Sequence, residues 1–210
     1  MRTSTRIRLC ATAALLVVPA AALATPLSVV EVSAPDINCV FHAGLPCTIT
    51  VTDSIGDIPL PATATGKAIL QTRTFTGGPG SPGAGKTGYD YRVDLSQVVS
   101  SFETPPCVTD LVIDFGVVTK LQYNKVGPLD DVFVVVKGGV GKIGLYSVEQ
   151  NRNIITFAFN QPVCPGLTPG TGASSFFFGL ASTHPPKAVA AKVSIPGLLP
   201  EDVKARAPDH

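Results

Sequence analysis

Alternation of apolar and polar residues with a period of two is the feature that most constrains the fold of this chain. It is cleanest in YDYRVDL, where Tyr89, Tyr91, Val93 and Leu95 share one side and charged residues occupy the other. Successive side chains of a strand point to opposite faces, so this pattern predicts a strand with one buried face.

Segments of the same kind recur at short intervals along the chain. They cover residues 27–33, 48–53, 67–76, 89–95, 107–115, 132–137, 140–149, 153–160, 174–182 and 188–195. Gly138-Gly139 predicts a two-residue hairpin turn within a three-stranded meander over residues 131–160. We therefore expect an all-β protein of about ten short strands, built as a two-sheet antiparallel β-sandwich. Jelly-roll and immunoglobulin-like arrangements both fit.

The two ends of the chain differ from this body. Arg2, Arg6 and Arg8 precede an apolar stretch over residues 9–23, and Ala22-Leu23-Ala24 has the small-x-small form of a signal-peptidase site. Residues 1–24 are thus predicted to be a signal peptide, with the mature chain starting near Thr25. The expected product is secreted, periplasmic or extracellular, without a transmembrane anchor.

The remaining boundaries follow from the strand pattern. Residues 25–196 are predicted to form a single sandwich domain. Residues 197–210 form a tail in which Pro200, the acids after it and the bases toward its end suit a short helix. A frayed tail has equal weight at this point.

Four cysteines remain after the signal peptide: Cys39, Cys47, Cys107 and Cys164. An even number in an exported chain predicts two disulfides rather than a metal site. Three pairings are possible, and we favour Cys39–Cys47 together with Cys107–Cys164.

The string GSPGAGKT over residues 80–87 matches the phosphate-binding pattern through Gly80, Gly85, Lys86 and Thr87. That pattern works only between a buried parallel strand and a helix. Here alternating strands flank it on both sides, so we interpret it as a loop between two antiparallel strands and predict no nucleotide partner. The chain without its signal peptide has a slight excess of acidic residues and no basic patch, which also argues against nucleic acid.

Catalytic patterns are weak. No G-x-S-x-G elbow occurs, and His42, His184 and His210 are the only histidines. A glycosidase needs two carboxylates on facing strands, and the available acids are Asp90, Asp94, Asp110, Asp114, Asp130 and Asp131. Such acids more often mark turns and solvent-facing positions. Asp130-Asp131 also suits a calcium ligand pair, although a turn is favoured. No catalytic residue, metal or cofactor is therefore predicted.

Three segments resemble exported bacterial β-rich surface proteins of the PEP-CTERM sorting class. They are AILQTRTFTG (68–77), VFVVVKGGVGKIGLYSVEQ (132–150) and PVCPG with SSFFFGLAS (162–166 and 174–182). The sorting tail of that class, a Pro-Glu-Pro signal with an apolar helix and a basic cluster, is replaced here by PEDVKARAPDH. The resemblance implies a surface protein and no catalytic residue.

Two strands break the alternation. In VFVVV (132–136) and in Phe176, Phe177 and Phe178, neighbouring apolar side chains must point to opposite faces. Either another segment covers the second face, or that face is an interaction patch for a partner, a lipid or self-association. Phe177 is predicted to point opposite to Phe176 and Phe178.

These observations favour an exported, non-catalytic β-sandwich that acts as a binding or structural component of the cell surface or extracellular matrix. The alternative is an extracellular carbohydrate-active protein, either a binding module or a carboxylate hydrolase. The chain has no tryptophan for a sugar platform, and Tyr89 and Tyr91 are expected to point inward.

Overall fold

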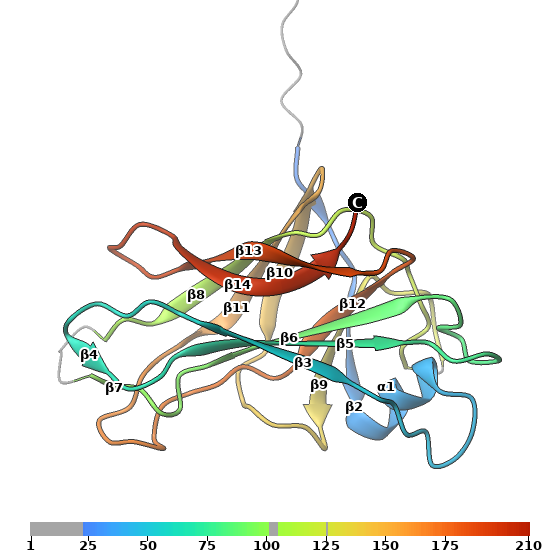
Figure 1. The fold of residues 1–210 in the computed structure, drawn as a ribbon, viewed down its shortest axis with the longest axis horizontal. Coiled ribbons are helices and arrows are strands. Elements are labelled where there is room, and N and C mark those ends of the chain that lie inside the picture. Colours follow the sequence, from blue (N-terminus) through green and yellow to red (C-terminus); the bar gives the residue numbers. More distant parts are fainter. Residues whose placement is uncertain (1–22, 101–104, 125) are drawn as a thin grey trace, which may run out of the picture.

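The computed structural model describes residues 23–100, 105–124 and 126–210, which form two packed six-stranded sheets and one helix (Figure 1). Sheet A contains, in spatial order, β1 (Thr25–Pro26), β10 (Leu145–Asn151), β11 (Ile154–Val163), β8 (Val108–Asp114), β13 (Pro186–Ser194) and β14 (Glu201–Pro208). Sheet B contains β2 (Val29–Ser33), β9 (Val132–Lys137), β12 (Phe178–Ser182), β6 (Thr87–Asp94), β5 (Ile69–Thr76) and β3 (Thr52–Asp57). The helix is α1 (Ala34–Phe41), and β4 (Ala64–Thr65) pairs with β7 (Val99–Ser100).

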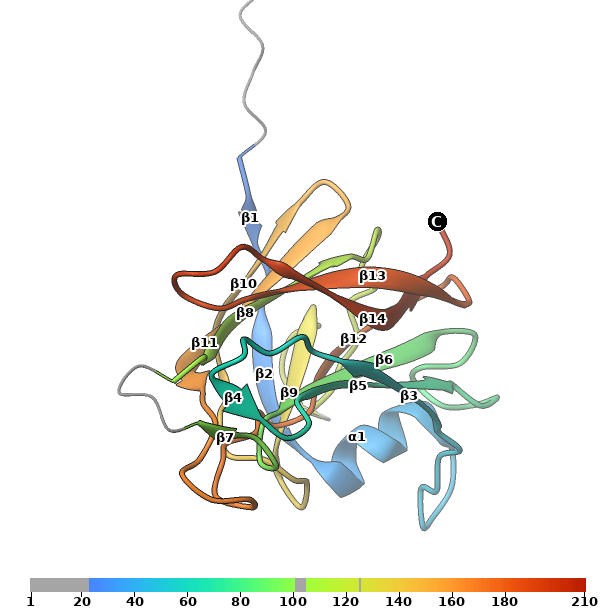
Figure 2. The same ribbon diagram turned by 60° about the vertical axis from the view of Figure 1, so that its left-hand side comes forward.

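The predicted all-β sandwich is confirmed. Every pair of neighbouring strands in the two large sheets is antiparallel except β2 and β9, which run parallel, so sheet B is mixed. The N-terminal chain pairs first with β10 in sheet A and then with β9 in sheet B, so it passes from one sheet to the other (Figure 2). At the opposite side, the sheets approach where Gly56 of β3 lies against the backbone of Lys204 in β14.

The main core lies between the two sheets. Tyr89, Tyr91, Val93 and Leu95 are all 0% exposed and belong to it, so the alternating pattern of YDYRVDL identified the inward face correctly. Sheet A supplies the opposing side chains, among them Leu111. Burying each large side chain stabilises the fold by roughly 1.5–3 kcal/mol, and this layer therefore dominates folding.

A second, smaller core lies on the outer face of sheet B, the face that points away from sheet A. Helix α1 covers part of this face (Figure 2), and Leu121 and Tyr123, from the chain between β8 and β9, pack into the same core. Phe133 of β9 packs here with its ring centroid 4.8 Å from that of Tyr123. This layer explains the apolar run of β9, because Val132 and Val134 join the main core while Phe133 and Val135 join the second one.

The predicted meander over residues 131–160 is wrong in its first part. β10 and β11 form the expected hairpin, but β9 belongs to the other sheet, between β2 and β12. Gly138 does adopt a positive φ of 71°, yet the turn starts a crossing from sheet B to sheet A. The physical reason is burial: a strand that is apolar on both faces is stable only where both faces are covered, and sheet B offers such a place.

The C-terminal tail was expected to be either a short helix or frayed, and both expectations are wrong. Its residues form β14, an edge strand of sheet A that pairs with β13 over its whole length. Val203, Ala205 and Ala207 are buried and the residues between them are partly or fully exposed. The alternation was present in the sequence, but alanines marked it only weakly.

The predicted strand over residues 48–53 begins later, at Thr52. Residues 48–51 leave the sheet and run past α1, a helix that the strand pattern did not predict. Ser33 caps that helix, Pro35 lies in its first turn, and Ile37 lies on its buried face. These start signals were readable in the sequence.

Asp131, at the start of β9, holds the N-terminal strand in place. Its carboxylate accepts hydrogen bonds from the backbone N–H of Ser28 at 3.0 Å, from the Ser28 hydroxyl at 2.9 Å and from Lys120 Nζ at 2.7 Å. Burial alone would raise the pKa of Asp131, but the bonds from Lys120 and Ser28 outweigh it and hold the pKa below its ordinary value. Asp131 thus has a structural role in fixing the chain crossing.

Candidate functional site

A cleft of about 470 Å³ opens on the outer face of sheet B, beside α1. Its walls are α1, the segment 49–51 and the turn 138–140, and its floor is formed by the sheet. The lining residues are Ala34, Ile37, Asn38, Ile49, Val51, Arg73, Asp90, Arg92, Val135, Gly138, Gly139, Val140 and Phe177. The size is in the range of sites that bind small molecules.

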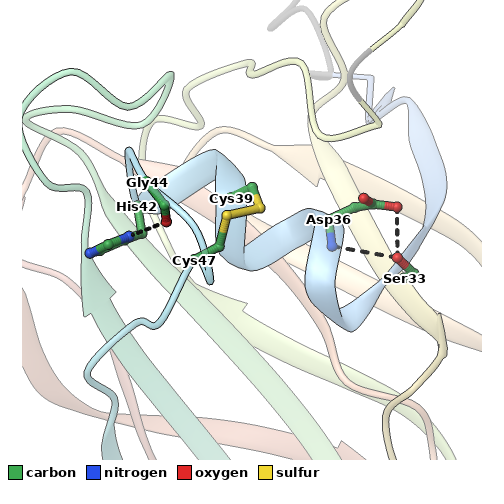
Figure 3. The surroundings of a disulfide bond; sticks show 6 residues. All are labelled: Ser33, Asp36, Cys39, His42, Gly44 and Cys47. Carbon is green, nitrogen blue, oxygen red and sulfur yellow. Dashed lines mark hydrogen bonds between the residues drawn. A yellow bond between two sulfur atoms is a disulfide. The ribbon is translucent and has the colours of Figure 1, made fainter.

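Local interactions fix the helical wall. The backbone N–H of Asp36 donates to the Ser33 hydroxyl, and that hydroxyl donates to the Asp36 carboxylate at 2.6 Å (Figure 3). Ile37, Val40 and Phe41 pack onto the sheet, which leaves Asn38 beside the cleft. The cap and the apolar face together set the position of an eight-residue helix that is too short to be stable alone.

The Cys39–Cys47 disulfide fixes the second wall. It joins α1 to the loop that follows it, with an S–S distance of 2.01 Å (Figure 3). Within this loop His42 Nδ1 lies 3.0 Å from the carbonyl oxygen of Gly44. Because the segment 49–51 begins two residues after Cys47, the disulfide limits how far this wall can move from the helix.

The sheet beneath the cleft carries a row of residues that pair across five strands, of which Asp90 and Arg73 line the cleft. Phe133 lies beside Gly179, Gly179 beside Asp90, Asp90 beside Arg73, and Arg73 beside Asp53. Gly179 is required here, since a Cβ at this position would lie 2.7 Å from both Asp90 Oδ1 and the ring of Phe133. The absence of a side chain at Gly179 leaves room for the Asp90 carboxyl group beside the Phe133 ring.

Two guanidinium groups share one aromatic ring. Cζ of Arg73 lies 4.3 Å and Cζ of Arg92 lies 5.6 Å from the ring centroid of Phe177. Cation–π attraction of this kind contributes on the order of 0.5–2 kcal/mol. Arg73 Nε also donates to Asp53 at 2.9 Å, and an Nη of Arg92 pairs with Asp94. Each guanidinium uses one nitrogen in these bonds, out of a donor set of five N–H groups.

Asp90 is the unusual group of the cleft. The residue is 8% exposed, and its Oδ1 has no hydrogen-bond partner among the described residues; the buried Nε of Arg92 has none there either. Burial raises the pKa of Asp90 to about 8, with Arg73 opposing the shift and Asp53 adding to it. This shift favours the protonated carboxyl group at neutral pH, a form that can donate one O–H hydrogen bond.

The cleft combines hydrogen-bond donors with apolar walls. Arg73, Arg92, Asn38 and the protonated Asp90 supply donors, while five aliphatic side chains line the remainder: Ile37, Ile49, Val51, Val135 and Val140. A search of the described residues finds no group of three or more His, Cys, Asp or Glu placed to hold a metal ion. The arrangement suits recognition of a small molecule that has both acceptor oxygens and carbon surface.

Both predicted disulfides are present, and the favoured pairing is confirmed. Cys107–Cys164 joins the start of β8 to the residue after β11, where Val108 and Val163 also pair. Two structural disulfides indicate an oxidising compartment.

The phenylalanine trio divides as predicted. Phe178 lies in the main core at 1% exposure, Phe176 packs against that core while partly exposed, and Phe177 points the other way. Phe177 is 5% exposed, so in the single chain it is no open patch; it forms part of the cleft floor. The sequence pattern located this residue but not the two arginines stacked on it.

The other candidate residues do not converge on one site. Asp110 and Asp114 lie on β8 in sheet A, and Asp114 lies 3.1 Å from His210 Nε2. Asp90 and Asp94 lie four residues apart on β6 in sheet B, and His42 is exposed in the loop beside Cys47.

The nucleotide-like string joins β5 to β6, which are antiparallel partners, as predicted. The backbone N–H of Gly83 donates to the Val40 carbonyl at 2.7 Å, and that of Gly78 donates to the Phe41 carbonyl at 2.9 Å. These bonds tie the loop to the end of α1. A strand follows the loop where phosphate binding requires a helix.

Within the described part of the chain, no helix has the length and apolar character needed to cross a membrane. The chain matches no protein-family model, no curated protein and no solved structure.

Proposed function

We propose that this protein is an exported, non-catalytic β-sandwich of the cell surface or extracellular matrix that acts by binding, and that it binds through the cleft beside α1. The observation that carries the proposal is Asp90. A buried carboxyl group whose Oδ1 lacks a partner within the described chain costs stability, on the order of 1–3 kcal/mol. Groups that folding does not use, placed in a cleft, are favoured candidates for ligand recognition.

Export is supported by two independent features. The two disulfides indicate an oxidising compartment. The basic start, the apolar stretch and the Ala22-Leu23-Ala24 sequence suit a signal peptide, and all but Leu23 and Ala24 lie outside the described residues. Mass analysis of the secreted protein tests this part: a mature N-terminus near Thr25 supports it, and a retained Met1 contradicts it.

Blocking the cleft tests the binding role. Val140 is 49% exposed on the rim, so Val140→Trp fills the mouth without disturbing a core. Leu167→Trp is the matched control, because Leu167 is 81% exposed and outside the cleft lining. Labelled mature protein is added to the producing cells and their matrix, and retention is measured. We expect the wild type and Leu167→Trp to be retained and Val140→Trp to be released; equal retention of all three contradicts a role of the cleft.

The carbohydrate-active alternative is less well supported by the exposed aromatic side chains. Of the tyrosines, Tyr89, Tyr91 and Tyr123 are buried, and Tyr146 is 81% exposed. Arg73 covers one face of the Phe177 ring. A polysaccharide pull-down with the same two variants tests this alternative, since capture that Val140→Trp abolishes would favour it.

A further inference from the structure

We propose that the cleft binds a small amphipathic carboxylate, with its anionic head at Arg73, Arg92 and Asp90 and its carbon chain among the aliphatic walls. This inference rests on the proposed function of the cleft and names its ligand class. The argument for the head and the argument for the body use different residues.

The charge of the ligand head is inferred from the charged side chains that line the cleft. Arg73 on β5 and Arg92 on β6 supply fixed positive charge, and Asp53 and Asp94, which pair with them, are absent from the cleft lining. Guanidinium groups recognise carboxylates through paired N–H donors. A ligand oxygen that accepts from these groups has the complementary chemistry, whereas an amine would meet two cations.

Asp90 adds a third donor while it is protonated. Apart from burial, the charged groups that shift its pKa are Arg73 on the neighbouring strand and Asp53 one strand further; Arg92, two residues along the same strand, also lines the cleft. Tyr123, from the chain between β8 and β9, also interacts with it. Helix α1, the segment 49–51 and the turn 138–140 place no charged side chain in the cleft lining. Deprotonation of Asp90 above about pH 8 would therefore add a negative charge beside the ligand head.

The body is identified by the walls. Ile37, Ile49, Val51, Val135 and Val140 offer aliphatic surface and no hydrogen-bonding side chain. The side chains of Val51 and Val140 are 37% and 49% exposed, and a bound carbon chain would cover part of this surface. Burial of such surface is favourable by about 25 cal/mol per Å². A hydroxyl-covered sugar ring would gain little from these walls.

Three eight-carbon probes that differ only in their heads test the proposal: octanoate, octanamide and octylamine. Binding to the mature protein is measured by calorimetry at pH 6. We expect saturable binding of octanoate, at least roughly 10-fold weaker binding of octanamide, and no binding of octylamine. Equal affinity for octanoate and octanamide overturns the proposal without requiring any variant.

Variants locate the head and the body. Arg73→Gln and Arg92→Gln are each expected to weaken octanoate roughly 10- to 100-fold, and Val140→Trp to block it. Arg206→Gln, on β14 in the other sheet, is the control and should bind as the wild type does. Wild-type affinity should fall as the pH rises past about 8, and Asp90→Asn should remove this dependence. Octanoate binding that none of the cleft variants changes overturns the proposal.

Two outcomes separate this inference from the proposed function. If cell-surface retention depends on Val140 but octanoate does not bind, the cleft remains the binding site and its ligand is not a carboxylate. If octylamine binds better than octanoate and Val140→Trp blocks it, the cleft binds cations and the inference is wrong in the charge of the head.

Discussion

The two faces of sheet B are both buried, but different kinds of side chain cover them. The inner face, against sheet A, carries Tyr91, Phe178 and other fully buried side chains in one continuous core. The outer face carries a smaller apolar core next to Arg73, Asp90 and Arg92, with a cleft between them. Single strands contribute to both: β9 places Val132 and Val134 on the inner face and Phe133 and Val135 on the outer one.

This difference separates stability from recognition. The inner face gains free energy from dense apolar packing, and its buried tyrosines find partners: Tyr89 donates to the His184 carbonyl and Tyr91 to the Arg206 carbonyl, both at 2.8 Å. The outer face leaves buried polar atoms of Asp90 and Arg92, which line the cleft, without partners in the described chain; on the inner face the Thr72 hydroxyl, 0% exposed, also lacks one. A ligand in the cleft would form the hydrogen bonds that the buried atoms of Asp90 and Arg92 lack.

The largest contrast is expected between Phe178 and Phe177. Phe178→Ala should cost about 3–5 kcal/mol, because the ring fills the core between the sheets. Phe177→Ala should cost less, since the cleft already borders its ring, and it should weaken octanoate binding by removing the surface on which the guanidiniums stack. Chemical denaturation measures both costs. An equal or larger loss for Phe177→Ala would remove the distinction between the faces.

The second largest contrast is expected between the two disulfides, in how much each stabilises the fold. Cys107–Cys164 spans 57 residues and Cys39–Cys47 spans 8, so loop-closure entropy predicts a difference of about 2 kcal/mol in favour of the longer loop. Removal of the short one should instead loosen the 49–51 wall and lower octanoate affinity. Melting and calorimetry of the paired Cys→Ser variants check this. The prediction fails if the 107–164 variant loses binding and the 39–47 variant does not.

Asp90→Asn is expected to stabilise the protein by about 1–3 kcal/mol at neutral pH. Because folding raises the pKa of Asp90 from 3.8 to about 8, the folded state binds a proton more tightly than the unfolded one. Wild-type stability should therefore fall as the pH rises between about 4 and 8, and the gain from Asn should grow over that window and level off above it. Asp202→Asn, at an exposed ion pair, is the control and should change stability by less than about 0.5–1 kcal/mol. A gain that does not vary with pH would contradict the burial of a neutral carboxyl.

Asp131→Asn should destabilise the protein, in contrast to Asp90→Asn. The expected loss in the free energy of unfolding, about 1 kcal/mol, is the smallest of these effects. Folding lowers the pKa of Asp131, so its contribution is present above the ordinary carboxyl pKa and is lost as the pH falls through the lower, folded value. The loss caused by the variant should thus shrink in acid. Melting temperatures from pH 2 to pH 7 measure this loss. A stabilising effect at pH 7 would contradict a stabilising role of the hydrogen bonds between Asp131 and Ser28.

The sequence predicted the inner face well because that face obeys strict alternation. Tyr89 to Leu95 could be assigned to a core from their spacing alone, and so could the opposite orientations of Phe177 and Phe178. The sandwich class and both disulfides followed from equally local patterns.

The outer face could not be predicted in the same way, because its cover comes from residues distant in sequence. Alternation showed that the side chains of Arg92 and Tyr91 point to opposite faces, but not that α1, Leu121 and Tyr123 would cover the outer one. The neighbours Arg73, Asp90 and Gly179 belong to three strands, and strand order was not readable. The cap of α1 at Ser33 and the alternation of Val203, Ala205 and Ala207 were available signals that the strand pattern overshadowed.

A nuclear magnetic resonance titration of the mature protein with octanoate at pH 6 tests most directly whether the outer face of sheet B is the binding surface. Saturable shifts are expected at the Nε–H groups of Arg73 and Arg92 and at the methyl groups of Val135 and Val140. The ring signals of Tyr91 and Phe178, on the inner face, should stay unchanged. Shifts confined to sheet A, or no saturable shift at any of these groups, would contradict the assignment of recognition to this face.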